Sequence, residues 1–302
     1  MNIFCFKMNL LNFFNLLEKI KLFLKPIYAK IRGQKENFIK INLEETFPGF
    51  APRSGGDFFQ KSKLTIESIN ETIPAINLLI ENLYSLNKPL GDNLVKDIKE
   101  VLEDNSDILA GEELADLFRH YGSDKAGKHD YYWFYGKLLK NRKEIKKILE
   151  IGLGTNNLDV ISNMGKDGKP GASLRAFRDF CPNAEIYGAD IDERILFIED
   201  RIKTFELDQT KLNTFNNLSK LIGGDFDLII DDGLHEPLAN INSLNFALKH
   251  IKKNGWIVIE DIYISSLPIW QNISFLFKGS DYETFLYKNK NNRFIFAINK
   301  LK

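Results

Sequence analysis

The hydrophobic pattern of the chain changes near residue 147. From there on, short apolar runs of strand length alternate with segments that carry an apolar stripe at helical spacing. Strands are predicted at residues 148–153, 185–190, 202–207, 226–231 and 255–260, and helices at 171–180, 193–199, 211–221 and 237–251. Two further strand-like runs, 282–288 and 293–299, surround a polar turn. This alternation predicts an α/β fold with a mostly parallel sheet, helices on both faces and an antiparallel strand from a C-terminal hairpin.

The part before residue 109 has a helical pattern and no chemistry of its own. Apolar positions recur at helical spacing in residues 10–24 and 64–86, and a short amphipathic helix is predicted at 94–102. Residues 35–64 show no clear period, and their Pro and Gly residues predict turns. A helix at 113–120 then precedes a dense mixture of aromatic and polar residues at 128–135. We therefore expect a helical N-terminal region at 1–108 and a catalytic domain at 109–302.

Residues 8–32 are strongly apolar, and two interpretations of them stay open. Glu18, Lys19 and Lys21 interrupt the apolar residues, so no uncharged run reaches the roughly 20 residues that cross a bilayer. No small-residue cleavage site follows, so a signal peptide is not predicted. We favour a helix that packs on its own protein or on a sister subunit of a homo-oligomer. The alternative is a helix that lies in the plane of a membrane as a peripheral anchor.

Composition and charge narrow the classes of partner and compartment. The 302 residues include 41 Lys and Arg and 41 Asp and Glu, so the formal net charge is zero. A nucleic-acid partner, which usually requires a basic face, is therefore not expected. The two cysteines, Cys5 and Cys181, lie in unrelated contexts and cannot build a disulfide framework or a thiolate metal site. This cysteine usage predicts a reducing, cytoplasmic setting.

Three strand ends in the first part of the predicted sheet carry the features of a cofactor pocket. Gly152 and Gly154 end the first strand and let backbone approach a ligand at the carboxyl edge of the sheet. Glu150 would repel a pyrophosphate, but it could accept hydrogen bonds from a cationic amino-acid ligand. Asp190 lies where a ribose diol would bind, and Asp208 is a candidate for the adenine amino group. Because the third glycine of a dinucleotide fingerprint is missing, these residues fit S-adenosylmethionine better than NAD.

The next two strand ends carry acidic residues and a histidine. The fourth strand ends at Asp231 and Asp232, and the fifth ends at Glu260 and Asp261. Neighbouring strands lie about 4.8 Å apart, so these carboxylates would repel one another unless a cation bridged them. Asp232, Glu260 and Asp261 offer hard oxygen ligands that suit Mg²⁺, and His235 can face the same spot as a general base. The alternative is that His235 caps the following helix and that the acids are solvated.

Taken together, these motifs resemble class I S-adenosylmethionine-dependent methyltransferases. More narrowly, they resemble the metal-dependent sugar O-methyltransferases that act on macrolide deoxysugars, and related proteins labelled cephalosporin hydroxylase or rhamnosyl O-methyltransferase. The resemblance covers about residues 110–262 and rests on the segments YGSDK at 121–125, ILEIGLG at 148–154, YGADID at 187–192, DDGLH at 231–235 and IED at 259–261.

The resemblance implies a Rossmann-like methyltransferase sheet, with S-adenosylmethionine and Mg²⁺ as cofactors. It implies that Asp232, Glu260 and Asp261 bind the metal and that His235 is the base. The segment with Ser123 and Lys125 contributes to the active-site region, and we assign both residues to the cofactor side. We assign Asp231 to that side as well, as a hydrogen-bonding neighbour of the metal ligands.

Two departures from the family pattern bear on the acceptor. Leu234 stands where the family usually has Ser, and a longer loop at residues 155–170 follows the first strand. The first could alter the acceptor wall, and the second could reshape acceptor entry. We therefore expect a Mg²⁺-dependent O-methyltransferase that acts on a sugar hydroxyl of a polysaccharide, glycolipid or glycosylated metabolite. The alternatives are a metal-independent small-molecule methyltransferase, an NAD-dependent sugar-modifying enzyme, and a binding module that retains the fold.

Overall fold

The computed structural model describes residues 95–302. The chain divides into two units, Met1–Ile76 and Asn77–Lys302, and the described residues belong to the second. The predicted helices at 10–24 and 64–86, the loop at 35–64 and the expected membrane or subunit contact of residues 8–32 lie outside the described residues. The division of the chain at residue 108 stays a prediction.

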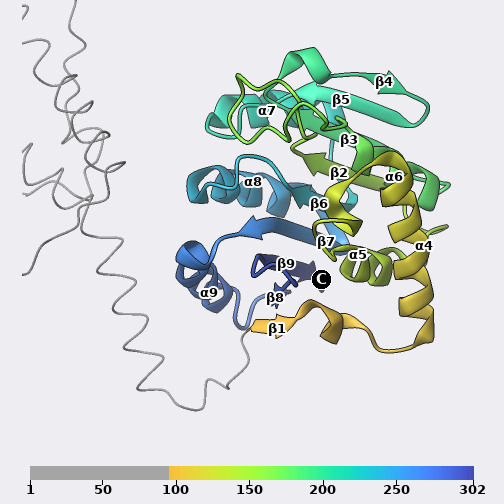
Figure 1. Ribbon diagram of the computed structural model, residues 1–302. Helices are drawn as coiled ribbons and strands as arrows, with labels where there is room; N and C mark the ends of the chain where they lie inside the picture. The colour runs from red at the N-terminus through yellow and green to blue at the C-terminus, as the bar shows by residue number, and fades with distance from the viewer. Residues whose placement is uncertain (1–94) are drawn as a thin grey trace, which may run out of the picture. The chain divides into compact units, whose positions relative to one another are not determined.

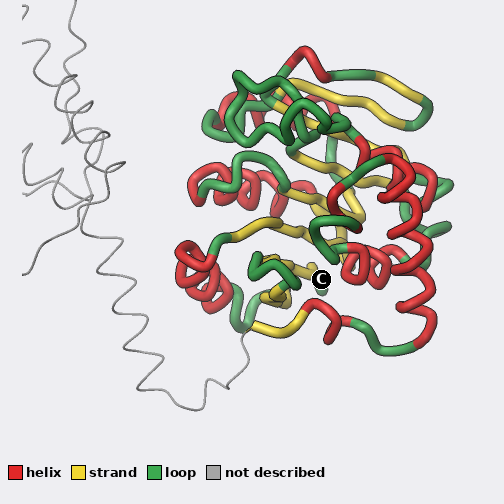
Figure 2. Tube along the Cα trace, in the orientation of Figure 1, coloured by secondary structure: helices red, strands yellow, loops and turns green. Residues whose placement is uncertain are grey.

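A nine-stranded sheet forms the centre of the described residues (Figures 1 and 2). Its strands are β1 (Val95–Asp97), β2 (Lys147–Ile151), β3 (Glu185–Asp190), β4 (Ile198–Glu199), β5 (Ile202–Glu206), β6 (Phe226–Asp231), β7 (Ile251–Ile262), β8 (Tyr282–Lys288) and β9 (Phe294–Lys300). They follow the order β1-β8-β9-β7-β6-β2-β3-β5-β4. All six residues of β6 are buried, as is typical of a parallel strand that is covered on both faces.

The pairing of the strands confirms the predicted fold class. β2 pairs in parallel with β3 and β6, β3 with β5, and β6 with β7. The C-terminal hairpin joins this parallel core through β9, which is antiparallel to both β7 and β8. Since parallel strands all end at the same edge of the sheet, the carboxyl ends of β2, β3, β6 and β7 lie close to one another.

Helices cover both faces of the sheet (Figure 1). They are α4 (Asn105–Tyr121), α5 (Tyr132–Leu139), α6 (Ala172–Phe180), α7 (Leu212–Ile222), α8 (Pro237–His250) and α9 (Leu267–Leu276), with 3₁₀ turns η1 (Ile98–Val101), η2 (Asp124–Ala126), η3 (Glu193–Ile195) and η4 (Ile264–Ser266). One core cluster joins α4, α5 and α6 to one face of the strands, and a second joins α7, α8 and α9 to the other. Within residues 95–302 no helix is both long and apolar enough to cross a bilayer.

Two predicted helices were wrong, and two helices were missed. In place of the helix predicted at 94–102, residues 95–101 form β1 and η1, because Val95–Asp97 pairs with β8 at the edge of the sheet. The helix predicted at 193–199 shrinks to η3, after which Ile198–Glu199 pairs with β5. Both windows are too short for helical spacing to outweigh the backbone hydrogen bonds of a neighbouring strand. The helices α5 and α9 were not predicted.

Candidate active site

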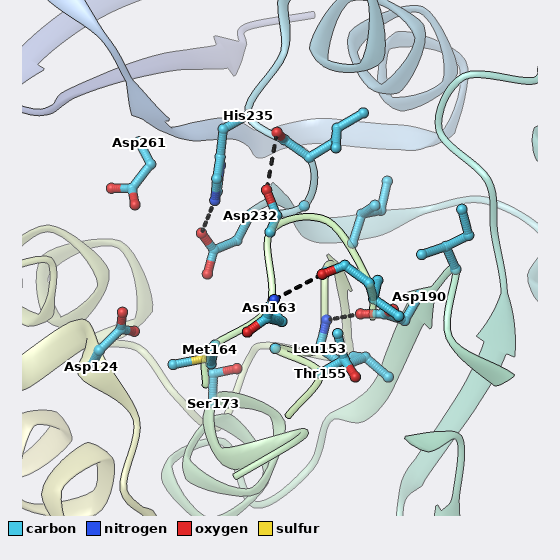
Figure 3. Close-up of a pocket in the computed structure, with 18 of the residues that line it drawn as sticks. Asp124, Leu153, Thr155, Asn163, Met164, Ser173, Asp190, Asp232, His235 and Asp261 are labelled. Atoms are coloured by element: carbon cyan, nitrogen blue, oxygen red, sulfur yellow. Dashed lines mark hydrogen bonds and ion pairs between the residues drawn. The ribbon is translucent and has the colours of Figure 1, made fainter. Parts of the chain in front are cut away.

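A cavity of about 470 Å³ opens at the carboxyl ends of the parallel strands (Figure 3). Its volume lies within the range of small-molecule sites. Two groups of residues that the sequence singled out separately both line it. The first group follows β2, β3 and β5 and includes Gly152, Gly154, Asp190 and Asp208; the second follows β6 and β7 and includes Asp232, Leu234, His235 and Asp261. The fold therefore places the predicted cofactor side and the predicted acidic rim in one cavity.

Gly152 fixes the contact between the loops that follow β2 and β6. Its φ angle is +94°, and a Cβ atom at this position would lie 2.2 Å from the carbonyl oxygen of Asp232. The backbone N–H of Asp232 in turn donates to the carbonyl of Ile151 over 2.8 Å. Glycine is therefore required here because another loop of the protein approaches, and this contact holds Asp232 at the cavity wall.

The loop at residues 155–170 closes over the second glycine. Gly154 has a φ angle of +73°, and a Cβ atom there would lie 2.3 Å from the sulfur of Met164. Met164 and its neighbours Val160, Ile161, Ser162 and Asn163 line the cavity. The loop that sequence analysis connected with acceptor entry thus forms part of the wall (Figure 3).

Asp190 ties the ends of β2 and β3 together at the cavity. One oxygen of its carboxylate accepts a hydrogen bond of 2.7 Å from the backbone N–H of Leu153, and the other accepts one of 2.9 Å from that of Asp192. Burial raises the pKa of Asp190. Asp208, which lines the same wall, forms an ion pair of 2.7 Å with Lys211. Burial would raise the pKa of Asp208, but Lys211 and Thr210 outweigh it and the pKa lies below its usual value.

A buried lysine binds three carboxylates beneath the cavity. The Nζ atom of Lys125 lies 2.7 Å from Asp232, 2.8 Å from both oxygens of Glu260 and 3.2 Å from Glu150. Only 1% of Lys125 is exposed. Burial alone would lower its pKa, but the three carboxylates outweigh burial and hold the pKa well above its usual value. The ammonium group is therefore a permanent internal cation at the acidic rim.

Asp232, His235 and Asp261 converge at one end of the cavity. One potential ligand atom from each lies within 4.8 Å of those of the others. The imidazole Nε2 of His235 is 4.0 Å from Asp232 (Figure 3), and its buried Nδ1 has no hydrogen-bond partner among the described residues. His235 and Asp261 both have positive φ angles, of 55° and 53°. Such strained backbone persists only where its surroundings enforce it, and it is common at functional sites.

The structure does not bring Glu260 to this group. Glu260 is buried, does not line the cavity, and accepts hydrogen bonds from Lys125 and from the hydroxyl of Tyr135. Its neighbour Asp261 faces the cavity and accepts a hydrogen bond from the hydroxyl of Tyr131. Two of the three predicted metal ligands therefore converge with His235, while the third binds an ammonium group.

Asp231 and Gln209 hold the loop that carries His235. The carboxylate of Asp231 accepts hydrogen bonds of 2.7 Å from Gln209 and 2.9 Å from Asn240 and does not line the cavity. The side-chain oxygen of Gln209 accepts from the backbone N–H of Leu234 over 2.8 Å. The following helix, α8, is capped by Glu236, whose side chain accepts from the N–H of Ala239. The alternative that His235 caps this helix is therefore wrong.

The remaining predicted cofactor residues lie on either side of the cavity wall. Ser123 lines the cavity and caps η2 through the backbone N–H of Lys125. Glu150 lies behind the wall, where one oxygen accepts a hydrogen bond from Ser173, a residue of the cavity lining. Lys125 lines the cavity together with its chain neighbours Ser123 and Asp124, and its ammonium group contacts the carboxylate of Asp232.

Sequence analysis missed several residues of the site. Tyr131 and Tyr135 lie in the aromatic and polar segment that it noted without assigning a role. His129 of the same segment was not missed, since the sequence offers it as a lesser candidate beside His235; it is buried, its Nδ1 bonds Asn289, and its Nε2 has no hydrogen-bond partner among the described residues. Gln209 gave no signal, because its role depends on a contact with a loop that follows another strand.

The residues present fit a divalent cation at Asp232 and Asp261. Two carboxylates with room for water or substrate are the protein contribution that Mg²⁺ usually receives. The convergence of their oxygens with the imidazole of His235, and the unpartnered buried nitrogen of that ring, are consistent with a polar group bound between them. The oxygens of Glu260 are already engaged by Lys125 and Tyr135.

Comparisons with known proteins point to the same class of enzyme. No family model matches the chain. The chain is 29% identical over 170 residues to mycinamicin VI 2''-O-methyltransferase of Micromonospora griseorubida, a match that covers 53% of this chain and 40% of that protein. It is 30% identical over 170 residues to demethylmacrocin O-methyltransferase of Streptomyces fradiae, again over 53% of this chain and 40% of that protein. The chain thus spans about two fifths of the length of these curated relatives.

A solved structure with the same fold is that of the MycE methyltransferase in complex with Mg, SAH and mycinamycin VI. The two structures superpose with a TM-score of 0.52 and 23% identity, over 63% of this chain and 55% of that chain. The described residues therefore have the fold of class I S-adenosylmethionine-dependent methyltransferases. By sequence, the chain is similar over about half of its length to the two O-methyltransferases named above.

Proposed function

We propose that this protein transfers a methyl group from S-adenosylmethionine to a sugar hydroxyl of a glycosylated small molecule or glycan, with the help of a divalent cation such as Mg²⁺. The observation that carries the proposal is the convergence of Asp232, His235 and Asp261 in a cavity that Gly152 and Asp190 also line. The relatives named above, which are O-methyltransferases by their names, support methyl transfer to an oxygen atom.

S-adenosylmethionine supplies an electrophilic sulfonium methyl group. Asp190, which lines the cavity, would accept hydrogen bonds from its ribose hydroxyls, as acids at this strand end do in nucleotide-binding sheets. Asp208, on the same wall, would receive the adenine amino group. Glu150 accepts a hydrogen bond from the hydroxyl of Ser173, which lines the cavity. Through Ser173 it would act on the amino-acid portion of S-adenosylmethionine.

The acceptor hydroxyl needs a site that binds and deprotonates it. Asp232 and Asp261 would hold the cation, which when bound lowers the pKa of a coordinated hydroxyl. His235 lies beside both carboxylates, with its Nε2 4.0 Å from Asp232, and takes the hydroxyl proton. Gln209 and Asp231 keep the loop of His235 in place, so the three groups are oriented before the acceptor arrives. Glu260 supports this arrangement through Lys125, which it shares with Asp232.

Lys125 favours a second candidate function, methyl transfer without a metal. Its ammonium group already neutralises much of the negative charge of Asp232 and Glu260, which is one task of a metal in such a site. In that case Asp232 and Asp261 would only position the acceptor hydroxyl for His235. Chelation separates the two candidates, because only the first requires a cation.

Cofactor binding is tested by calorimetry with S-adenosylhomocysteine and, separately, with NAD. We expect binding of the first and no measurable heat with the second. Binding of NAD alone would contradict the proposal and favour a sugar-modifying oxidoreductase.

The catalytic roles are tested with a labelled methyl donor. We expect EDTA to abolish transfer and Mg²⁺ to restore it, whereas full activity under EDTA would support the metal-independent candidate. His235→Ala should reduce the rate by about 100- to 10,000-fold, the usual contribution of a general base. His120→Ala, at an exposed position of α4, is the matched control and should keep the wild-type rate.

The ligand assignment is tested by Mn²⁺ binding, followed by electron paramagnetic resonance without any acceptor. Asp261→Asn removes a direct ligand and should weaken Mn²⁺ binding by about 100-fold or more, whereas Glu260→Gln acts through Lys125 and should cost only about tenfold. A loss of affinity in Glu260→Gln as large as that in Asp261→Asn would support Glu260 as a metal ligand, as the sequence prediction had it.

A further inference from the structure

A stacked arginine stands at the cavity wall on the side of the acidic rim. The guanidinium carbon of Arg293 lies 3.8 Å from the ring centroid of Tyr263. Both residues line the cavity together with His235 and Asp261. Arg293 is half-buried and directly precedes β9. A guanidinium group held against an aromatic ring has lost much of its freedom, so it is pre-oriented for a ligand.

The turn that carries Arg293 is fixed to the body of the site. The side-chain oxygen of Asn289 accepts a hydrogen bond of 3.0 Å from the backbone N–H of Arg293. The side-chain nitrogen of Asn289 forms a hydrogen bond of 2.9 Å with Nδ1 of the buried His129. Lys290 donates through its backbone to Asp130 over 3.2 Å and through its side chain to the carbonyl of Gly127 over 3.0 Å. The position of Arg293 relative to the acidic rim is thus set by hydrogen bonds to the segment that also carries Tyr131.

In the residues that the structure describes, Arg293 has no charge partner, unlike Lys125 in the cavity lining and two cations close to it. Lys125 is paired with Glu260, Arg194 with Asp192, and Lys211 with Asp208. Within residues 95–302, no carboxylate lies within ion-pair distance of Arg293, and its guanidinium has no hydrogen-bond acceptor. Lys128, an exposed residue of the same cavity lining, likewise has no acidic partner in the described part of the chain. Lys169, a third cation of the lining, also has no acidic partner among the described residues, but of the three only Arg293 is held against an aromatic ring at the side of the acidic rim.

We propose that Arg293 binds an anionic group of the acceptor, a carboxylate or a phosphate, with Lys128 adding positive charge at the entrance. This proposal rests on the proposed function and narrows its substrate class from sugars in general to acidic or phosphorylated sugars. The planar guanidinium can donate two parallel hydrogen bonds to either anion. Binding of the anion at Arg293 orients the acceptor, so that a neutral hydroxyl faces His235 on the same side of the cavity.

The test compares three sugars that differ only at one carbon atom: methyl α-glucoside, its uronic acid and its 6-phosphate. Their affinities are measured by calorimetry with the full-length protein in the presence of Mg²⁺, with and without S-adenosylhomocysteine. We expect at least one anionic sugar to bind roughly 10- to 100-fold more tightly than the neutral one, the gain typical of charge-assisted hydrogen bonds. The stronger of the two anions identifies the group as carboxylate or phosphate.

Variants assign the effect to Arg293. Arg293→Ala should reduce the affinity for the anionic sugar to that of the neutral sugar, and Arg293→Lys should keep part of the advantage. Arg119→Ala removes an exposed arginine of α4 that is paired with Asp116, and it should behave as the wild type. Because Arg293→Ala removes no contact with the donor side, its affinity for S-adenosylhomocysteine should stay within about twofold.

Equal affinity for all three sugars, including no measurable binding of any, would overturn the proposal, as would an anion preference that survives in Arg293→Ala. S-adenosylhomocysteine is titrated first into the same protein. Its failure to bind would contradict the proposed function, whereas the sugar series without it still decides the role of Arg293.

Discussion

Replacement of Lys125 by Met should destabilise the protein more than any other single loss of a cation near the cavity. The ammonium group is 1% exposed and lies within 2.8 Å of Asp232 and Glu260 and 3.2 Å of Glu150. Removal of one partner of a buried ion pair leaves an uncompensated charge and costs about 3–5 kcal/mol. Here three carboxylates would lose their shared cation, so we expect the upper part of that range. Domains are typically stable by only about 5–15 kcal/mol.

A double variant separates lost charge from lost packing. In Lys125→Met with Glu260→Gln, the ammonium group and one of its counter-charges are removed together. Since replacement of a whole buried pair is often close to neutral, we expect the double variant to regain roughly 1–2 kcal/mol relative to Lys125→Met. Such a coupling is characteristic of residues in direct contact.

The assay is urea unfolding at neutral pH, followed by circular dichroism. Lys302→Met is the matched control, because Lys302 forms an exposed ion pair of 3.3 Å with Asp281, and such pairs contribute at most about 1 kcal/mol. A loss of less than about 1 kcal/mol in Lys125→Met would refute the reasoning. So would additive losses in the double variant, which would mean that Lys125 and Glu260 are not energetically coupled.

Three further predictions concern other parts of the described unit. Burial would raise the pKa of Asp107, but hydrogen bonds from two lysines and a backbone N–H outweigh burial, so the pKa in the folded protein lies below the ordinary value of 3.8. The wild type should therefore exceed Asp107→Asn in free energy of unfolding by the full amount at neutral pH, and by less as the pH falls below 3.8. A difference in stability that does not change in acid would contradict this. Gly152→Ala should displace Asp232, whose carbonyl a Cβ atom would meet at 2.2 Å, and weaken both Mn²⁺ and S-adenosylhomocysteine binding by about tenfold or more in calorimetry; unchanged affinities would count against the loop contact. Burial raises the pKa of Cys181 to about 12. In a Cys5→Ser background, a disulfide reagent at pH 8 should therefore modify the Cys181 thiol at least about 100-fold more slowly in the native protein than in urea. Rapid labelling of the native protein would show that the thiol is accessible.

The sheet could be predicted from the sequence because its central strands are covered on both faces. β6 matched its predicted bounds, since six buried residues run directly into two acids and a turn. β3 and β8 matched as well. The edges failed, because β1 and β4 owe their extended backbone to single neighbouring strands that lie far away in the sequence or across a tight turn.

The acidic rim could be predicted as a set of residues, but its internal arrangement could not. The side chains of adjacent residues in a strand point to opposite faces of the sheet. Glu260 and Asp261 are adjacent, so the strand alone does not require both to face the cavity. The register of β7 shifts between Ile259 and Ile262, and Asp261 has a positive φ angle within that irregularity. Lys125, which then binds Glu260, is 135 residues away along the chain, and local sequence patterns give no signal of such a contact.

The central claim is that this cavity joins the methyl group of S-adenosylmethionine to a sugar oxygen in a cation-dependent reaction. The most direct measurement incubates the full-length protein with donor carrying a CD₃ group and a library of neutral and acidic glycosides, with Mg²⁺ or with EDTA, and locates the label by tandem mass spectrometry. The account predicts a CD₃–O group on the sugar ring that forms with Mg²⁺ and not with EDTA or in His235→Ala. Label on a nitrogen or carbon atom, or an oxygen-linked label that forms equally under EDTA and in His235→Ala, would contradict it.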